Sequence, residues 1–157
     1  MSVDRELLFS TLFSRLQNIT DFAYVSRLLK LYDDIEPYKQ PSLMMVKGQE
    51  TITQDKGMPP LWKLEGTIYV YCRNDADTAV SPSIQLNKLI QKVEEAFERK
   101  PGEGQSANAQ VTNTNDFLTT LNGLCSHCSI AGTIVTDEGT LGNQAVAVIP
   151  FEIYVSA

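Results

Sequence analysis

The stretch that decides the fold is LCSHCSIAGTIVTDEGTLGNQAVAVIPFEIY, residues 124–154. Two apolar runs rich in β-branched residues, 128–135 and 145–155, lie on either side of a segment that contains two glycines and an asparagine. Two β-prone runs separated by turn-forming residues are typical of a β-hairpin. We therefore predict that the last third of the chain is a strand, a loop and a second strand.

The segment between the two runs, 136–143, is too long for a two-residue turn, so we expect a loop whose tip projects beyond the sheet. Glycine permits unusual backbone angles, and carboxylates set the charge of a contact surface. The loop is therefore a candidate surface for contacts with another subunit or partner. Its candidate contact residues are Asp137, Glu138, Gly139, Leu141, Gly142 and Asn143.

Pro150 lies in the second run, on the opposite face from the apolar residues of that run. Because proline has no N–H to donate to a strand ladder, Pro150 predicts a bend or an edge position at this point. The apolar face itself is continuous and consists of Ala145, Ala147, Ile149, Phe151, Ile153 and Val155.

The clearest single strand lies in the middle of the chain, at 61–72. Alternate residues from Trp62 to Cys72 are apolar or small, and the residues between them are polar or aromatic, as in a half-buried antiparallel strand. Tyr69 and Tyr71 lie on the polar face. Tyrosine is enriched at protein interfaces, so both are candidates for a subunit contact. The alternative is that they pack beneath a helix or a loop.

Two segments repeat their apolar residues with the period of an amphipathic helix. The first is 4–16, for which Ser2 or Asp4 is the expected N-cap. The second begins after Ser81 and Pro82, a pair typical of a helix start, and ends before a Pro-Gly pair. Each helix is expected to bury its apolar stripe against the sheet.

Together these patterns predict one α+β domain spanning 1–157, with a mostly antiparallel sheet, two amphipathic helices on one face and a projecting C-terminal hairpin. Shorter strands are expected at 22–32 and 41–46. Two polar segments rich in small residues, 48–60 and 101–116, are expected to be loops.

Charge and composition narrow the classes of function. The chain has 157 residues, enough to bury one core, and its 13 basic against 19 acidic residues give a net charge of -6. This balance disfavours sequence-independent binding to nucleic-acid phosphates and to anionic membrane surfaces. No stretch approaches the roughly 20 apolar residues of a membrane span. The charged N-terminal segment does not resemble a secretory signal.

Cys125, His127 and Cys128 form the most suggestive chemical motif, CSHC. A structural zinc needs about four ligands, and the only other cysteine is Cys72. In a strand, His127 points away from Cys128, and redox Cys-x-x-Cys motifs precede a helix whereas a strand follows here. We therefore expect no metal and no cofactor. Three sparse cysteines indicate a reducing compartment without a disulfide framework.

The single histidine also limits catalysis, because a Ser-His-Asp or Cys-His system would have to use it. No nucleophile-elbow, phosphate-loop or dinucleotide-binding motif occurs. The adjacent acids at 33–34 and 137–138 are more typical of a solvated surface than of acid–base pairs. The sequence predicts no enzyme and no catalytic residues.

The hairpin region resembles the tail terminator, or tail completion, proteins of long-tailed bacteriophages, the minor tail protein U-like family. The resemblance lies in SHCSIAGTI at 126–134 and DEGTLGNQAVAVIP at 137–150. Shorter segments support it, namely VSR at 25–27, QPSLM at 40–44 and GMPP at 57–60. The order of predicted elements is also similar over nearly the whole chain.

The resemblance implies a structural virion protein. In that family six copies form a ring that caps the tail tube, stops its elongation and provides the surface for head joining. The implied partners are further copies of the chain, the tail tube protein and a head completion or connector protein. DNA would pass through the ring without sequence-specific binding, and no membrane is involved. The implied location is the head-proximal end of the virion tail, assembled in the cytoplasm of a bacterial host.

Two alternatives remain open at this point. The first is a head–tail connector, neck or other minor tail subunit with a similar fold. The second is a small bacterial ligand-binding domain or enzyme, which a buried pocket with a perturbed titratable group would favour.

Overall fold

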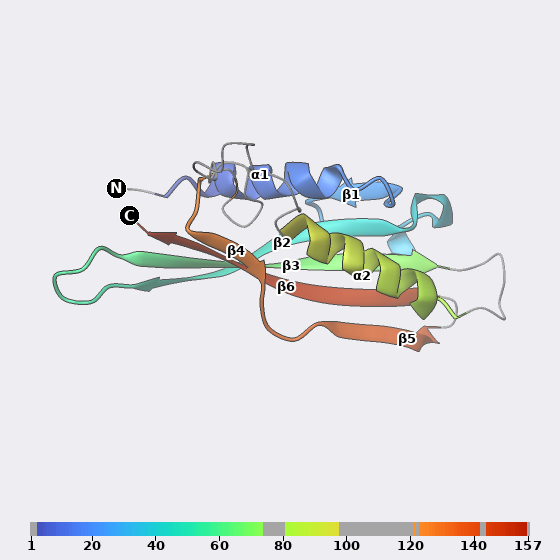
Figure 1. Cartoon of the computed structure of the whole chain (residues 1–157). Helices are drawn as coiled ribbons and strands as arrows, with labels where there is room; N and C mark the ends of the chain where they lie inside the picture. The colour runs from blue at the N-terminus through green and yellow to red at the C-terminus, as the bar shows by residue number, and fades with distance from the viewer. Residues whose placement is uncertain (1–2, 74–80, 98–120, 122, 142–143, 157) are drawn as a thin grey trace, which may run out of the picture.

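One twisted sheet and two helices on the same side of it form two layers (Figure 1). The computed structural model describes residues 3–73, 81–97, 121, 123–141 and 144–156. In this part of the chain the sheet has six strands and is mostly antiparallel, which confirms the predicted α+β class. The α-helices and strands are α1 (Arg5–Gln17), β1 (Tyr24–Ser26), β2 (Ser42–Thr53), β3 (Leu61–Arg73), α2 (Ser83–Phe97), β4 (His127–Ile130), β5 (Val135–Leu141) and β6 (Gln144–Ser156). Two short 3-10 helices, Tyr32–Asp34 and Pro37–Lys39, lie between β1 and β2.

The sheet order is β1-β2-β3-β6-β4, and β5 also pairs with β6. Among the described strands, only the pairing of β1 with β2 is parallel, with Tyr24 opposite Ser42. β3 and β6 form the centre and pair over thirteen residues each, from Leu61 opposite Ser156 to Arg73 opposite Gln144. This long central pair defines the axis along which the other elements lie.

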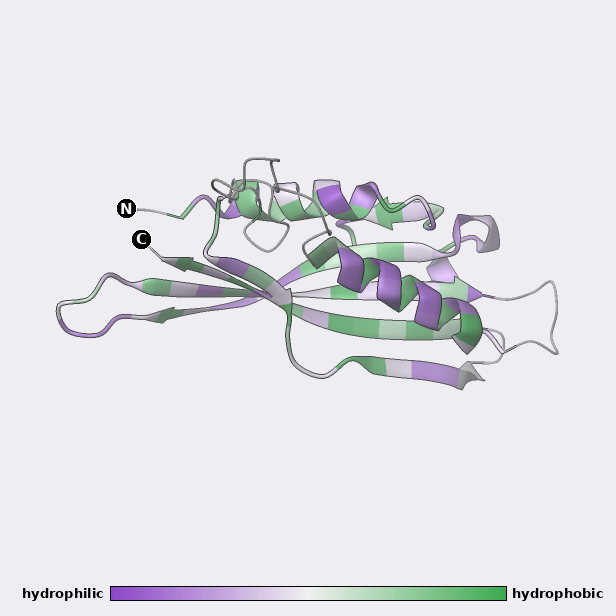
Figure 2. Ribbon diagram, viewed as in Figure 1, coloured by the Kyte–Doolittle hydropathy of each residue, from purple (hydrophilic) through white to green (hydrophobic). Residues whose placement is uncertain are grey.

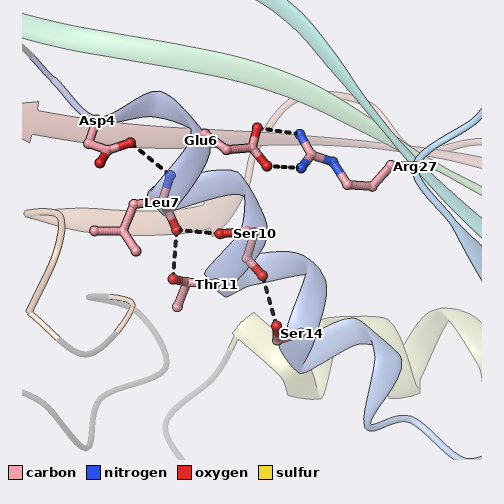
Figure 3. Close-up of polar contacts among 7 residues, drawn as sticks. All are labelled: Asp4, Glu6, Leu7, Ser10, Thr11, Ser14 and Arg27. Carbon is pink, nitrogen blue, oxygen red and sulfur yellow. Dashed lines mark hydrogen bonds and ion pairs between the residues drawn. The ribbon is translucent and has the colours of Figure 1, made fainter.

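α1 begins where Asp4 caps it, because the Asp4 carboxylate accepts a hydrogen bond of 3.0 Å from the backbone N–H of Leu7 (Figure 3). Of the two residues predicted as caps, Asp4 is therefore confirmed. An ion pair also holds the N-terminal end of the helix, because the Glu6 carboxylate accepts two hydrogen bonds from the Arg27 guanidinium (Figure 3). Its apolar stripe of Leu8, Phe9, Leu12 and Leu16 is buried.

α2 begins as predicted, with the Ser81 hydroxyl accepting a hydrogen bond of 3.2 Å from the N–H of Ser83. Leu86, Leu89, Val93 and Phe97 are its buried residues. The ribbon of α2 alternates hydrophilic and hydrophobic stretches along its length, as expected for a helix with one buried side (Figure 2). The predicted loop at 101–116 lies outside the described residues.

The core lies between the helices and one face of the sheet, and Phe151 is central to it. Its ring makes an edge contact with Phe9 of α1, with centroids 6.2 Å apart, and a tilted contact with Phe97 of α2 at 5.9 Å. The predicted apolar face of β6 points into this core, and five of its six residues, all except Val155, are fully buried. A single β6 side chain thus joins both helices to the sheet.

β4 and β5 run in the same direction along one edge of β6 and are separated by residues 131–134, opposite Pro150. The Pro150 carbonyl accepts a hydrogen bond from Ala131, so the missing N–H of Pro150 faces this gap. Gly132, at φ +106°, makes the turn that the gap requires. At Pro150, β6 pairs with β3 on one side and faces this gap on the other, which agrees with the predicted edge position at this point. The run 128–135 is not one continuous strand.

Three other predicted boundaries were wrong. The segment 136–143 is not a long loop, because β5 continues to Leu141 and pairs with β6 up to Gln144. The strand predicted at 22–32 is limited to the three residues of β1. The loop predicted at 48–60 is shorter, because β2 continues to Thr53 after a register shift between Lys47 and Glu50.

Candidate assembly surface

The most prominent exposed feature is the hairpin formed by β2 and β3, which reaches beyond the ends of both helices (Figure 1). Alternating Thr51, Ile52 and Thr53 favour an extended arm, and Ile52 pairs with Trp62 across the hairpin. The connecting residues 54–60 turn at Gly57, which has φ +80°. The arms therefore continue as paired strands past the helix-covered core.

Apolar side chains are exposed along this hairpin. Ile52 is 58% exposed and Met58 is 61% exposed, and Leu61 is also exposed. In Figure 2 the tip is mostly hydrophilic with a hydrophobic segment where β3 begins. Within the described residues no element covers these side chains. Ile52 pairs with Trp62 and Leu61 pairs with Thr53, so Ile52 and Leu61 project from opposite faces of the hairpin and leave apolar groups exposed on both sides of this end of the molecule.

The face of the sheet opposite α1 and α2, called the open face below, is the second candidate surface. One end of it is covered by residues 27–40, where Ile35 packs on Met44 and Tyr71. The remainder carries the alternate residues of the central strands, most of them half-buried. On β3 and β6 these are Lys63, Glu65, Thr67, Tyr69, Val148, Pro150, Glu152 and Tyr154.

Two carboxylates lie directly opposite each other on the open face, Glu65 on β3 and Glu152 on β6. Like charges in this arrangement are unfavourable unless they are neutralised. The Lys63 ammonium lies 3.5 Å from Glu65 and 4.0 Å from Glu152, and the Tyr154 hydroxyl donates a hydrogen bond of 2.9 Å to Glu152. This hydrogen bond raises the pKa of Tyr154.

The second oxygen of Glu65, Oε2, is buried and has no hydrogen-bond partner. A concavity of about 240 Å³ lies at this position and crosses the sheet from Gly48 and Gln49 of β2 to Ala131. Glu65, Thr67, Pro150 and Glu152 also line it. Two carboxylates, one ammonium and an unpaired carboxylate oxygen make this part of the open face suited to a cation supplied from outside. Sequence reasoning missed this site, because the β3–β6 register, which places Glu152 and Tyr154 opposite Glu65 and Lys63, is not apparent from either strand alone.

The predicted acidic contact pair does not form one surface. Asp137 pairs with Val146 and Glu138 with Ala145, so their side chains point to opposite faces of β5. Glu138 accepts a hydrogen bond from the Ser81 hydroxyl at the start of α2, and Asp137 is half-buried on the open-face side. The predicted loop is therefore a strand, and the two carboxylates do not share one face. Their role in a subunit contact stays a prediction.

The remaining predicted contact residues of 136–143 are Gly139, Leu141, Gly142 and Asn143. The backbones of Gly139 and Leu141 belong to β5, and Leu141 pairs with Gln144. Gly142 and Asn143 lie outside the described residues.

Tyr69 and Tyr71, both predicted as candidates for a subunit contact, differ in their burial and in their contacts. Tyr71 is 5% exposed, its hydroxyl donates a hydrogen bond of 2.8 Å to the carbonyl of Lys30, and its ring makes an edge contact with Tyr32. The alternative of packing beneath a loop is therefore correct for Tyr71. Tyr69 is half-buried on the open face and remains a candidate contact residue.

The CSHC motif does not form a site on one face. Cys128 points into the core and Cys125 is also buried, whereas His127 is exposed on the opposite face of β4. Burial raises the pKa of Cys72 and of Cys125 to about 11, and that of Cys128 further. These thiols are protonated at neutral pH, the opposite of a reactive or metal-binding cysteine.

The described residues contain no group of three or more histidines, cysteines and acids that could hold a metal ion. A second concavity, of about 300 Å³, lies between the end of α1 and α2. Its charged lining residues are Arg15, Asp21, Lys92 and Glu95, and it includes none of the cysteines and not the histidine.

None of the helices in the described part of the chain is long and apolar enough to span a membrane. No protein-family model matches the sequence, and no curated protein matches it either.

Proposed function

We propose that the chain is a structural subunit of a bacteriophage tail, a terminator-like protein whose copies form a ring on the tail tube. Such a ring ends tube elongation and offers a surface for joining the head. The observation that carries the proposal is the β2–β3 hairpin, whose exposed apolar residues Ile52, Met58 and Leu61 extend beyond the core.

The shape of the subunit supports contacts between copies. The hairpin tip and the open face are different surfaces at different places on the molecule, so a contact that joins one to the other is heterologous. Heterologous contacts repeat from copy to copy, and they produce a closed ring when the rotation between neighbours completes a circle. A single-sheet subunit with one open face and one protruding hairpin suits this arrangement.

The resemblance of residues 126–134 and 137–150 to tail terminators is the reason for proposing that the chain assembles on a phage tail. The two segments include β4, most of β5 and the first half of β6, so they correspond to one edge of the sheet and the strand beside it. The net charge of -6 is compatible with a channel through which DNA slides without adhering.

The proposal is tested by assembly on tubes. The chain is co-expressed with the tail tube protein encoded in the same phage or prophage genome, and the tubes are imaged by electron microscopy. We expect a ring at one end of each tube and shorter tubes than without the chain. Tubes of unchanged length with no added density at either end would reject the terminator function and favour a connector or a ligand-binding domain.

A further inference from the structure

We propose that the β2–β3 hairpin tip of one copy, residues 54–60, docks on the open face of the next copy and places Lys56 against Glu65 and Glu152. This inference rests on the proposed ring function and specifies the contact that builds the ring. Its occupant is a second copy of the same chain.

Charge complementarity is the first argument. The cluster on the open face holds two carboxylates and one ammonium, and one Glu65 oxygen is buried without a partner. Lys56 is exposed at the hairpin tip and makes no ion pair within the described part of the chain. A second ammonium would balance the two carboxylates and supply a donor to the unpaired oxygen.

Lys56 cannot reach the Glu65–Glu152 pair of its own chain. Glu65 is four residues beyond Leu61 along β3, and Leu61 pairs with Thr53 at the base of the tip. At about 3.3 Å per residue, the tip begins roughly 13 Å from the carboxylates along a paired and extended hairpin. Because the arms are held by pairing with each other, Lys56 cannot turn back onto this sheet. Lys56 can therefore reach such a carboxylate cluster only on another copy of the chain.

Apolar contacts support the same arrangement. Met58 is two residues from Lys56 on the tip and is largely exposed. Next to the carboxylates the open face carries Pro150 and Val148, both half-buried, and the concavity there measures about 240 Å³. Methionine is flexible and adapts to irregular surfaces, so the tip is able to bury Met58 while Lys56 reaches Glu65 and Glu152.

Charge reversal tests the contact. We expect Lys56→Glu or Glu152→Lys to weaken self-association, measured by sedimentation velocity over a range of concentration, by about tenfold or more. The double variant restores an opposite-charge pair and should associate within a few-fold of the natural chain. The matched control is Lys88→Glu, an exposed lysine on α2 that should leave association unchanged. Thermal melting verifies that each variant is folded.

Disulfide trapping gives a second and independent test. Met58→Cys and Thr67→Cys are prepared as separate proteins, and the three natural cysteines are buried, so background labelling is low. The heterologous contact predicts cross-linked dimers only when the two variants are mixed. Met58→Cys homodimers alone would show that two tips meet each other, and would overturn the docking.

The outcomes separate this inference from the function on which it rests. If the natural chain forms rings and Lys56→Glu forms them equally well, the docking contact is wrong and the terminator function stands. If the natural chain neither associates nor binds tubes, both are wrong. If the double variant is no better than the single variants, the pairing of Lys56 with Glu152 is wrong.

Discussion

A β-carbon on Gly66 would lie 2.3 Å from Cζ of Phe151, because the phenylalanine ring covers this glycine on the helix-facing side of the sheet. The ring cannot move aside easily, since it is in contact with Phe9 and Phe97. The Val46 carbonyl also lies 2.9 Å from the same position. The glycine therefore permits β2, β3 and β6 to pack beneath the two helices.

Gly66→Ala is expected to destabilise the fold by about 1–3 kcal/mol, as overpacking of a filled core does. Chemical denaturation followed by tryptophan fluorescence measures the change, with Trp62 as the only reporter. In a Phe151→Leu background the same substitution should cost less, because the smaller side chain leaves room for the new methyl group. Equal stability of Gly66→Ala and the natural chain would contradict the packing described for Phe151.

Tyr71→Phe is expected to lower stability by about 1 kcal/mol while leaving self-association unchanged. The lost hydroxyl holds the segment 27–40 on the sheet through the Lys30 carbonyl. For stability, Tyr69→Phe is the matched control, since the Tyr69 hydroxyl makes no hydrogen bond within the described residues. An effect of Tyr71→Phe on association, with stability unchanged, would instead assign Tyr71 to the interface.

Glu50 is expected to stabilise the fold at neutral pH but not in acid. Hydrogen bonds from Lys47, at 2.6 Å, and Arg5, at 2.7 Å, lower the pKa of Glu50. A carboxyl whose pKa is lower in the folded state stabilises the fold above its unfolded pKa, and loses this effect as the pH falls through the folded value. Glu50→Gln should thus cost about 1 kcal/mol near neutral pH and progressively less on acidification.

Urea denaturation of both proteins at a series of pH values measures this difference. High salt should reduce it, because the ion pairs are partly exposed. A difference between the two proteins that stays constant from neutral to acidic pH would show that the Glu50 pairs contribute no stability.

The cysteines are expected to be unreactive in the folded chain. Cys72, Cys125 and Cys128 are buried, and burial raises the pKa of each thiol. A thiol reagent such as Ellman's should label none of them on mixing at pH 8, and all three once the protein is unfolded. Rapid labelling of the folded protein would contradict the burial of the CSHC segment.

Much of the fold was predictable from periodicity. The alternation at 61–72 and the helical stripes at 4–16 and after Ser81 each correspond to a described element. These patterns are local, since one face of a strand or helix must be apolar wherever it meets a core. The Asp4 cap was predictable for the same reason, because capping depends only on neighbouring residues.

Strand limits were less predictable because they depend on pairing between distant segments. The glycine and the two acids of 136–141 suggest a loop, yet this segment pairs with β6. Residues 50–53, which are polar except for Ile52, were assigned to a loop too, yet β3 supplies their partners. A strand at the edge of a sheet or in a protruding hairpin needs no apolar residues where it has no core to cover.

The carboxylate pair was missed because it arises only from register. Glu65 and Glu152 are far apart in the sequence and lie on strands whose polar faces look ordinary one at a time. The pairing of Lys63 with Tyr154 on the same face repeats this relationship two residues away. To predict either pair, one would have had to know which residues of β3 lie opposite which residues of β6.

The most direct test of the ring proposal is the mass of the chain in solution, measured by light scattering over a wide concentration range. One chain has a mass of 17.4 kDa. We predict a transition from this mass to a fixed multiple, six chains by the family resemblance, that does not grow further as the concentration rises. A closed ring gives such a plateau, because all its contacts are satisfied. A mass of one chain at every concentration, with and without tail tubes, would contradict the proposal that copies of the chain form a ring.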